Sequence, residues 1–405
     1  MNKSIENIIE YGKKLAGMDF AVGDHPRILL QSGMHVYATT EGAPMDALNA
    51  DYITDIGPGA DSFKSAMLGA GFQAMIISQP EYAGMCIEDS LAIPAVLDDM
   101  AMIVGTKVQI VPEDRFSMMK ALKKASAVMT ENGNLITCGR NLYEALTCLL
   151  VLEKNAEIFV DADFLGGAYP VNPILGRIER AVYQYKYSKK EIEKQNAKEA
   201  GEAPAVAAAD SGNTEPAATP QWTPEEANLR DAVVEYGKKL VACGLVQGTW
   251  GNLSVRLDDE YMLCTPSGRD YAGILPDEIV KVNIATLEYS GEVKPTSEKD
   301  FHAGIYRNRS DVNAIIHTHS KFACVFAACG LTFKTTSGDV IECAAYGPSG
   351  TGILSKNVQE AIGQNKGCLM KNHGMVAVGS DLRNALRNAQ SIEDAAKKRI
   401  DEFWK

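Results

Sequence analysis

Two histidines separated by one residue end an apolar segment and form the first candidate metal-ligating pair. They lie in Ala314-Ile-Ile-His317-Thr-His319. Alternate side chains of an extended strand point to the same face, so His317 and His319 are expected to face one way. A third candidate, His373, follows downstream in Asn372-His373-Gly374. Three imidazoles that leave one position open are the ligand set of a catalytic rather than a structural zinc site.

A carboxylate precedes these histidines in Lys294-Pro-Thr-Ser-Glu298. A His-x-His pair alone also fits two polar residues at the end of a strand, and Glu298 alone also fits a carboxylate that caps a helix. Together, His317, His319, His373 and Glu298 favour a metal-assisted reaction over these structural alternatives.

The composition indicates a globular protein with more than one core. The chain has 405 residues, of which 46% are hydrophobic, and a formal net charge of -12. This length predicts two domains. The negative charge, without a sustained Lys/Arg run, argues against nucleic acid and requires local donors for an anionic substrate.

The cysteines and the hydropathy pattern predict a cytoplasmic protein. Nine cysteines occur without a Cys-x-x-Cys pair, and Met1-Asn-Lys-Ser4 leads into an amphipathic helix rather than a signal peptide. No apolar run reaches the length needed to cross a membrane, so we expect no membrane partner.

A repeated segment divides the chain into two similar halves. Glu10-Tyr-Gly-Lys-Lys-Leu15 recurs as Glu235-Tyr-Gly-Lys-Lys-Leu240, and shorter matches follow in the same order. We therefore predict a tandem duplication, with domains at residues 1–189 and 222–405. Residues 190–221, rich in Ala, Glu, Pro and Gly, are expected to form a flexible linker because they carry almost no large apolar residue.

Periodicity predicts alternating helices and strands in the second half, and hence a three-layer α/β/α domain. The expected helices are 225–242, 297–308, 321–328 and 381–403. The expected strands are 252–256, 261–264, 279–283, 314–317, 368–372 and 375–378.

Five ordered motifs of the second half carry a family resemblance. They are Gln247-Gly-Thr-Trp-Gly-Asn252-Leu-Ser254, Thr265-Pro-Ser-Gly268, Lys294-Pro-Thr-Ser-Glu298, His317-Thr-His319 and Asn372-His373-Gly374. The second half thus resembles the class II aldolase/adducin family, typified by fuculose-phosphate aldolase. The resemblance implies an α/β/α sandwich, a fourfold ring, and a metal-dependent sugar-phosphate aldolase or epimerase. The family that the second half resembles also includes adducin-like structural proteins, which lack the metal ligands.

The resemblance assigns roles to particular residues. It implies that His317, His319 and His373 hold Zn²⁺, or another divalent metal such as Mn²⁺ or Co²⁺, and that Glu298 is the general base. A divalent metal that chelates two adjacent oxygens would stabilise the enediolate left by cleavage of a ketose phosphate. The phosphate cradle implied by the family consists of Asn252, Ser267, Gly268, Thr296 and Ser297. Small residues at the start of a helix suit an anion.

The first half lacks this chemistry. In our alignment Ser78 and Pro80 replace His317 and His319, and Asn132 replaces His373. Glu41 replaces Ser267, and Arg27 falls near the place of Asn252. His25 and His35 match no ligand position. We therefore interpret the first half as a degenerate copy.

The second half also departs from the aldolase pattern. The family supplies a tyrosine after its paired histidines and another from a C-terminal tail, but residues 333–338 contain no tyrosine and we expect no tail after Lys405. The proton donor to the leaving aldehyde therefore stays open. The candidates are Tyr346, Tyr169, Tyr183, Tyr185 and Tyr187.

The main hypothesis is a metal-dependent lyase that cleaves a small ketose 1-phosphate to dihydroxyacetone phosphate and an aldehyde. The alternatives are an epimerase or dehydratase of the same family and a non-catalytic adducin-like scaffold. Epimerases resembling this family tend to carry Asp where Glu298 stands, and the complete ligand set argues against a scaffold. The expected assembly is a homodimer whose four domains form one ring.

Overall fold

The computed structural model describes residues 2–18, 26–57, 61–185, 222–246 and 250–404. The linker expected at 190–221 lies outside these residues, as do His25, Tyr187 and the first three residues of the Gln247 motif. The described chain forms two compact units, one from residues 2–160 and 170–185 and the other from residues 161–169 and 222–404. The short segment 161–169 thus lies with the second unit, although the sequence assigned it to the first domain. Among the described helices, none is long and apolar enough to cross a membrane.

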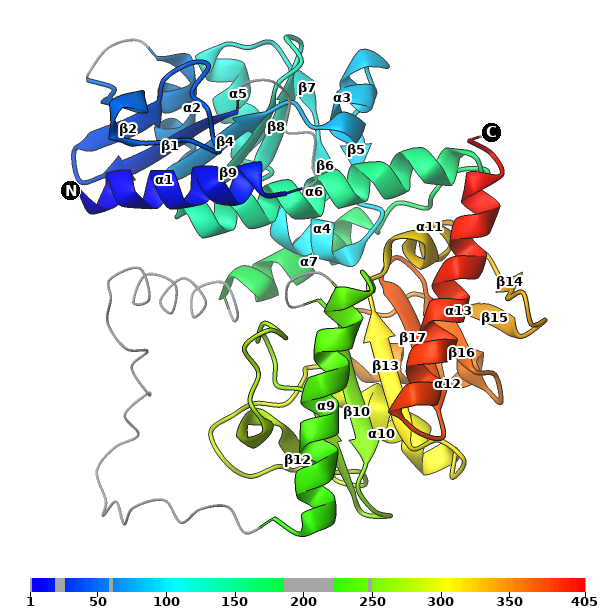
Figure 1. The fold of residues 1–405 in the computed structure, drawn as a ribbon. Coiled ribbons are helices and arrows are strands. Elements are labelled where there is room, and N and C mark those ends of the chain that lie inside the picture. The colour runs from blue at the N-terminus through cyan, green and yellow to red at the C-terminus, as the bar shows by residue number, and fades with distance from the viewer. Residues whose placement is uncertain (1, 19–25, 58–60, 186–221, 247–249, 405) are drawn as a thin grey trace, which may run out of the picture. The chain divides into compact units, whose positions relative to one another are not determined.

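The second unit is built on an eight-stranded sheet with the order β12-β11-β10-β13-β17-β16-β15-β14 (Figure 1). Neighbouring strands are antiparallel except for β15 and β16, which are parallel. The strands are β10 (Asn252–Arg256), β11 (Tyr261–Cys264), β12 (Val280–Asn283), β13 (Ala314–Thr318), β14 (Phe333–Lys334), β15 (Val340–Ala344), β16 (Gly367–Met370) and β17 (Gly374–Gly379).

Helices cover both faces of this sheet and give three layers. They are α9 (Pro224–Ala242), α10 (Lys299–Asn308), α11 (Lys321–Cys329), α12 (Gly352–Ile362) and α13 (Leu382–Asp401). On one face, Phe301 and Ile305 of α10 pack with Leu354 and Val358 of α12 against Ile315 of β13. Helix α13 contacts α9, α11 and β17 on the other face. The α/β/α layering predicted for residues 222–405 therefore describes this unit.

The first unit has a seven-stranded sheet of the same kind, with the order β3-β2-β1-β4-β9-β8-β7. Its only parallel pair among the described strands is again the last, β7 with β8. Helices α2 and α5 pack on one face of the sheet, and α1 contacts β1 and β2. The strands are β1 (Arg27–Ser32), β2 (His35–Thr39), β3 (Ile53–Asp55), β4 (Ala74–Ser78), β7 (Ile110–Val111), β8 (Ala127–Thr130) and β9 (Leu135–Gly139). The helices are α1 (Lys3–Ala16), α2 (Ser62–Ala70), α3 (Glu81–Glu88), α4 (Asp98–Ile103), α5 (Arg115–Leu122), α6 (Leu142–Asp163) and α7 (Pro173–Tyr183), and β5 (Ile93–Pro94) pairs with β6 (Lys107–Val108).

The repeated motif performs the same packing in both units. A Cβ on Gly12 of α1 would lie 2.5 Å from Leu48, and a Cβ on Gly237 of α9 would lie 2.4 Å from the ring of Tyr271. Each glycine thus lets its helix approach a hydrophobic side chain of the loop that follows the second strand of its sheet. This close contact gives a packing reason for the glycine that the two segments share.

In each unit, a buried glutamate on the longest helix accepts backbone hydrogen bonds at the start of another helix. In the first unit, Glu153 of α6 accepts the backbone N–H groups of Tyr82 and Ala83 at the start of α3. In the second unit, Glu393 of α13 accepts those of Phe322 and Ala323 at the start of α11. Burial raises the pKa of both carboxyls, that of Glu153 to about 7. The contact of Glu393 fixes the start of the helix that directly follows His319.

The strand register corrects our alignment of the two halves. Strand β4 pairs Ala74 with Gly139, just as β13 pairs Ala314 with Gly379. Three residues after these pairs, Ile77 corresponds to His317. Two residues beyond that, Gln79 corresponds to His319. Ser78 and Pro80 were therefore one residue out of register. A shift of one residue moves a side chain to the other face of a sheet, so the correction changes which side chains can reach the site.

The same correction applies at the third ligand. Met129 pairs with Leu135 across the β8–β9 turn, and Leu369 pairs with Met375 across the β16–β17 turn. Gly133, rather than Asn132, therefore occupies the place of His373. In both turns this residue donates its N–H to the carbonyl three residues earlier.

Most predicted elements of the second half agree with the structure to within two residues. The exceptions are β14, β15 and α12, which we did not predict. The exposure of β15 does not alternate regularly along the strand, and α12 begins with a glycine. Strand β15 therefore lacks a clear alternating pattern, whereas α12 does bury Leu354, Val358 and Ile362 at helical spacing and could have been predicted from it.

Candidate active site

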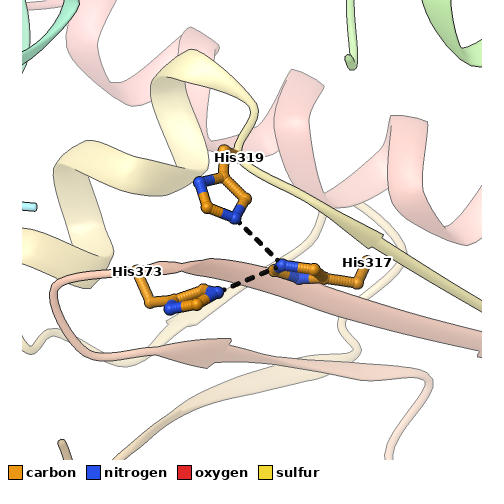
Figure 2. A group of neighbouring side chains, drawn as sticks. All are labelled: His317, His319 and His373. Carbon is orange, nitrogen blue, oxygen red and sulfur yellow. Dashed lines mark hydrogen bonds between the residues drawn. The ribbon is translucent and has the colours of Figure 1, made fainter. Parts of the chain in front are cut away.

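Three imidazoles of the second unit meet at one point (Figure 2). The Nε2 atom of His317 lies 3.0 Å from that of His319 and 3.2 Å from that of His373. Nitrogen ligands about 2.0–2.1 Å from a tetrahedral zinc lie about 3.3 Å from one another. The two separations from His317 therefore fit a divalent metal, and the three predicted ligands are brought together, with their ligand atoms all within 4.8 Å of one another.

The surroundings of His317 leave its Nε2 lone pair free to bind a cation. Its other ring nitrogen, Nδ1, lies 2.9 Å from the carbonyl oxygen of Met375 and donates to it. This hydrogen bond fixes the tautomer, as is usual for metal-binding histidines. Burial lowers the pKa of His317 to about 3, which keeps the imidazole neutral.

A strained turn positions His373. The preceding residue, Asn372, has a φ of 58°, and its side-chain amide donates to the carbonyl oxygen of Tyr169, 2.6 Å away. The following residue must be glycine, because a Cβ on Gly374 would lie 2.4 Å from the carbonyl oxygen of Thr318. A residue of segment 161–169 therefore holds the turn that carries the third ligand.

Glu298 faces the same point as the histidines. It occupies the position before the first residue of α10, yet its side chain makes no capping hydrogen bond. Instead, Oε2 lies 3.2 Å from Nε2 of His317, and Oε1 lies 3.1 Å from Nε2 of His373. The capping alternative is therefore wrong, and the carboxylate belongs to the site.

Two side chains donate hydrogen bonds to this carboxylate. The amide of Asn252 lies 2.8 Å from Oε2, and the hydroxyl of Ser349 lies 3.1 Å from Oε1. Burial raises the pKa of Glu298, but its interactions with His317 and His373 lower the pKa by more than burial raises it. The pKa of Glu298 therefore lies well below its usual value. We therefore treat Glu298 as ionised.

The two segments of the predicted phosphate cradle lie side by side. Ser267 donates its N–H to Lys294 O, and Thr296 donates its N–H to Thr265 O, so the segments pair as antiparallel chains. Gly268 has a φ of 66°, which favours glycine. Ser297 and Gly268 are exposed, and Thr296 is buried with its hydroxyl accepting the N–H of Glu298.

The structure places Asn252 differently from the other cradle residues. Both ends of its buried amide are engaged, one by Glu298 and the other by Nε2 of His302. Neither His302 nor Ser349 is among the residues that the sequence indicated for the site. The spacing of four residues from Glu298 to His302 could have indicated a shared helix face, whereas no local signal marks Ser349.

Comparisons with known proteins match the second half of the chain to one family. Residues 231–400 match the family model "Class II Aldolase and Adducin N-terminal domain". The chain is 34% identical over 175 residues to 5-deoxy-D-ribulose 1-phosphate aldolase of Bacillus thuringiensis serovar kurstaki, covering 42% of this chain and 82% of that protein. It is 35% identical over 184 residues to 5-methylthioribulose-1-phosphate/5-deoxyribulose-1-phosphate aldolase of Rhodospirillum rubrum, covering 44% and 80%. It is 32% identical over 180 residues to L-fuculose phosphate aldolase of Escherichia coli K12, covering 43% and 83%.

The fold and the site thus define an α/β unit with a histidine centre of the kind that binds a divalent cation. The chain belongs to the class II aldolase and adducin family.

Proposed function

We propose that the second unit cleaves a small ketose 1-phosphate by retro-aldol chemistry to dihydroxyacetone phosphate and an aldehyde. The observation that carries this proposal is the position of Glu298, whose two oxygens lie 3.1 and 3.2 Å from the Nε2 atoms of His373 and His317. A base beside a metal centre suits a reaction that passes through an enediolate. The names of the three relatives, all aldolases of sugar 1-phosphates or sugar phosphates, support the same class of substrate.

His317, His319 and His373 would hold the metal, which we propose is Zn²⁺ or another divalent ion such as Mn²⁺ or Co²⁺. When bound, it would act as a Lewis acid that stabilises negative charge on two adjacent oxygens of the substrate. The protein contributes the buried imidazole of His317, which burial keeps neutral and the carbonyl of Met375 orients, and that of His373, which the turn at Asn372 positions.

Glu298 would carry the proton at the third carbon of the substrate. In cleavage, a second group takes the proton of the hydroxyl on the fourth carbon, the bond between the third and fourth carbons breaks, and its electron pair stays on the third carbon as an enediolate. The Glu298 carboxylate would take up a proton from solvent and pass it to that carbon, and in the reverse direction the ionised carboxylate would remove it. Asn252 and Ser349 hold the carboxylate in place during this exchange.

The phosphate would bind beside the carboxylate. Ser267, Gly268, Thr296 and Ser297 bring small residues and the start of α10 to one place, and a helix N-terminus favours an anion. Asn252 remains a proposed phosphate ligand through the Nδ2–H that Glu298 does not use.

The group that takes the proton of the fourth-carbon hydroxyl in cleavage, and donates it to the aldehyde oxygen in the reverse direction, is still open among the tyrosines named above. Tyr169 lies beside the third ligand, because its carbonyl accepts from Asn372 and its ring lies 4.2 Å from the ammonium of Lys371. This position favours Tyr169 over the other candidates.

We also propose that the two units arose by tandem duplication and that the first is a degenerate copy. The shared strand order supports this origin, and Ile77, Gln79 and Gly133 at the ligand positions cannot bind a metal as imidazoles do.

The proposed assembly is a homodimer whose four domains form one ring, and light scattering should give the mass of two chains. The proposed compartment is the cytoplasm, in agreement with nine cysteines that are all free.

A product assay tests the proposed function. The metal-loaded protein is incubated with a panel of ketose 1-phosphates, including 5-deoxyribulose 1-phosphate and fuculose 1-phosphate, and dihydroxyacetone phosphate is measured by a coupled dehydrogenase. Release of dihydroxyacetone phosphate that stops after chelation and returns with added metal supports the proposal. An isomeric sugar phosphate as the product would indicate an epimerase. No turnover of any substrate by the metal-loaded protein would favour the scaffold.

A further inference from the structure

Behind Glu298, five polar side chains form one continuous chain of hydrogen bonds. Strand β10 supplies Asn252 and Ser254, which lie on the same face of the strand. Helix α10 supplies His302 and Tyr306, one turn apart, and Glu298 precedes the helix. All five side chains are buried. The bonds join Tyr306 Oη to Ser254 Oγ (2.9 Å), Ser254 Oγ to His302 Nδ1 (2.7 Å), His302 Nε2 to Asn252 Oδ1 (2.6 Å) and Asn252 Nδ2 to Glu298 Oε2 (2.8 Å).

The orientation of the Asn252 amide sets the direction of the bonds. Its NH₂ group lies toward Oε2 of Glu298 and its carbonyl oxygen toward Nε2 of His302, so the amide donates to the carboxylate and accepts from the imidazole. His302 must then carry its proton on Nε2 to donate to that oxygen. Burial lowers the pKa of His302 to about 3, so the ring is neutral and has only this one N–H.

This tautomer of His302 also sets the direction of the remaining two hydrogen bonds. Without a proton, Nδ1 of His302 accepts a hydrogen bond, and Ser254 must donate its hydroxyl proton to it. Ser254 in turn accepts from Tyr306, whose phenol stays protonated because burial raises its pKa. Among these five side chains, no hydrogen-bond donor therefore faces another donor.

We propose that His302 is a positioning residue that sets the orientation of the Asn252 amide and thereby holds Glu298 in place. The proposal rests on the proposed function in so far as Glu298 serves there as the base. Without the Nε2–H donor, the amide of Asn252 would be free to rotate by half a turn and to place its oxygen against the carboxylate. Ser349 would then hold Oε1 alone, and the Oε2 atom would lose its donor.

Two substitutions of His302 separate hydrogen bonding from packing. The His302 ring lies against that of Phe301, with centroids 4.5 Å apart, so His302→Phe keeps an aromatic side chain but removes both nitrogens. His302→Gln keeps one donor and one acceptor in place of Nε2 and Nδ1. We expect His302→Phe to lower kcat by about 10- to 100-fold with unchanged metal per chain, and to raise KM as well because Asn252 is also a proposed phosphate ligand. We expect His302→Gln to recover most of both losses.

A double-mutant cycle with Glu298→Gln tests whether His302 acts through the carboxylate. If it does, adding His302→Phe to Glu298→Gln lowers the residual single-turnover rate by less than about twofold. Two results would overturn the proposal. One is an equal loss of kcat in His302→Phe and His302→Gln, and the other is a loss in the Glu298→Gln background as large as in the wild type.

A readout that does not need turnover keeps this proposal separate from the proposed function. In ¹⁵N NMR spectra of the full-length protein with labelled histidines, His302 should show the neutral Nε2–H tautomer between pH 6 and 8, identified by comparison with His302→Gln. An Nδ1–H tautomer would refute the hydrogen-bond chain even in an active enzyme. The Nε2–H tautomer in a protein that cleaves no ketose phosphate would support the chain and reject only the proposed function.

Discussion

The carboxylate of Glu298 lies across the open side of the histidine cluster, with Oε2 3.2 Å from Nε2 of His317. This contact brings the end of a loop before α10 to the end of β13, two positions 19 residues apart in the sequence. It places a carboxylate, which we propose is the base, beside the three histidines that we propose hold a metal. It also makes Glu298 a potential fourth ligand, so its role has to be tested against metal content.

The protein should bind one divalent metal per chain. Only the second unit brings three imidazoles together among the described residues, and Ile77 and Gln79 stand at the ligand positions of the first sheet. His319→Ala should abolish binding at micromolar metal, because two ligands rarely hold the ion. Elemental analysis of the purified protein checks both statements, with Gln79→Ala as the matched control. Two equivalents per chain, or a loss of metal in the control, would contradict this prediction.

Glu298→Gln should keep the metal and the fold but lose turnover. Removal of a general base typically costs about 100-fold or more in kcat, whereas the three histidines remain in place. The measurement is kcat together with zinc per chain and the melting temperature. If the variant loses its metal, Glu298 is a ligand rather than the base, and unchanged activity would place the base elsewhere.

The stability of the metal-free protein should fall as the pH falls below about 6.5. The pKa of buried His302 is lowered to about 3, so the unfolded chain takes up a proton at a pH where the folded protein does not. Its contribution is therefore complete above pH 6.5 and is lost between pH 6.5 and 3, at roughly 1.4 kcal/mol per pH unit. Urea unfolding at several pH values measures the slope, which should be shallower in His302→Gln by about one proton. An unchanged slope would mean that His302 does not titrate on unfolding.

The turn before His373 should be sensitive to backbone strain. Asn372 has a φ of 58° and donates to Tyr169, so Asn372→Ala loses a hydrogen bond and adds strain. We expect the free energy of unfolding to fall by about 1–3 kcal/mol, with weaker zinc binding. Asn372→Gly should lose less, because glycine adopts positive φ without strain. Equal losses in the two variants would show that strain contributes nothing.

The sequence by itself determined the local features of this protein. The two-residue period of a strand placed His317 and His319 on one face, and helix and strand periodicity gave most elements of the second half to within two residues. The repeated Glu-Tyr-Gly-Lys-Lys-Leu segment indicated two similar halves. These predictions succeed because the repeat distances of helices and strands are fixed by the backbone and do not depend on distant residues.

Only the tertiary structure decided which distant groups meet. The pairing of Ala74 with Gly139 fixed the register that replaced Ser78 by Ile77 at the first ligand position. The approach of α10 to β10 joined His302 to Asn252, and the loop before α12 brought Ser349 to Glu298. Such contacts depend on how elements far apart in the chain pack against one another, and the same local sequence is compatible with many packings. The three histidines that meet could therefore be named from the sequence motifs, but the hydrogen bonds that position the neighbouring carboxylate could not.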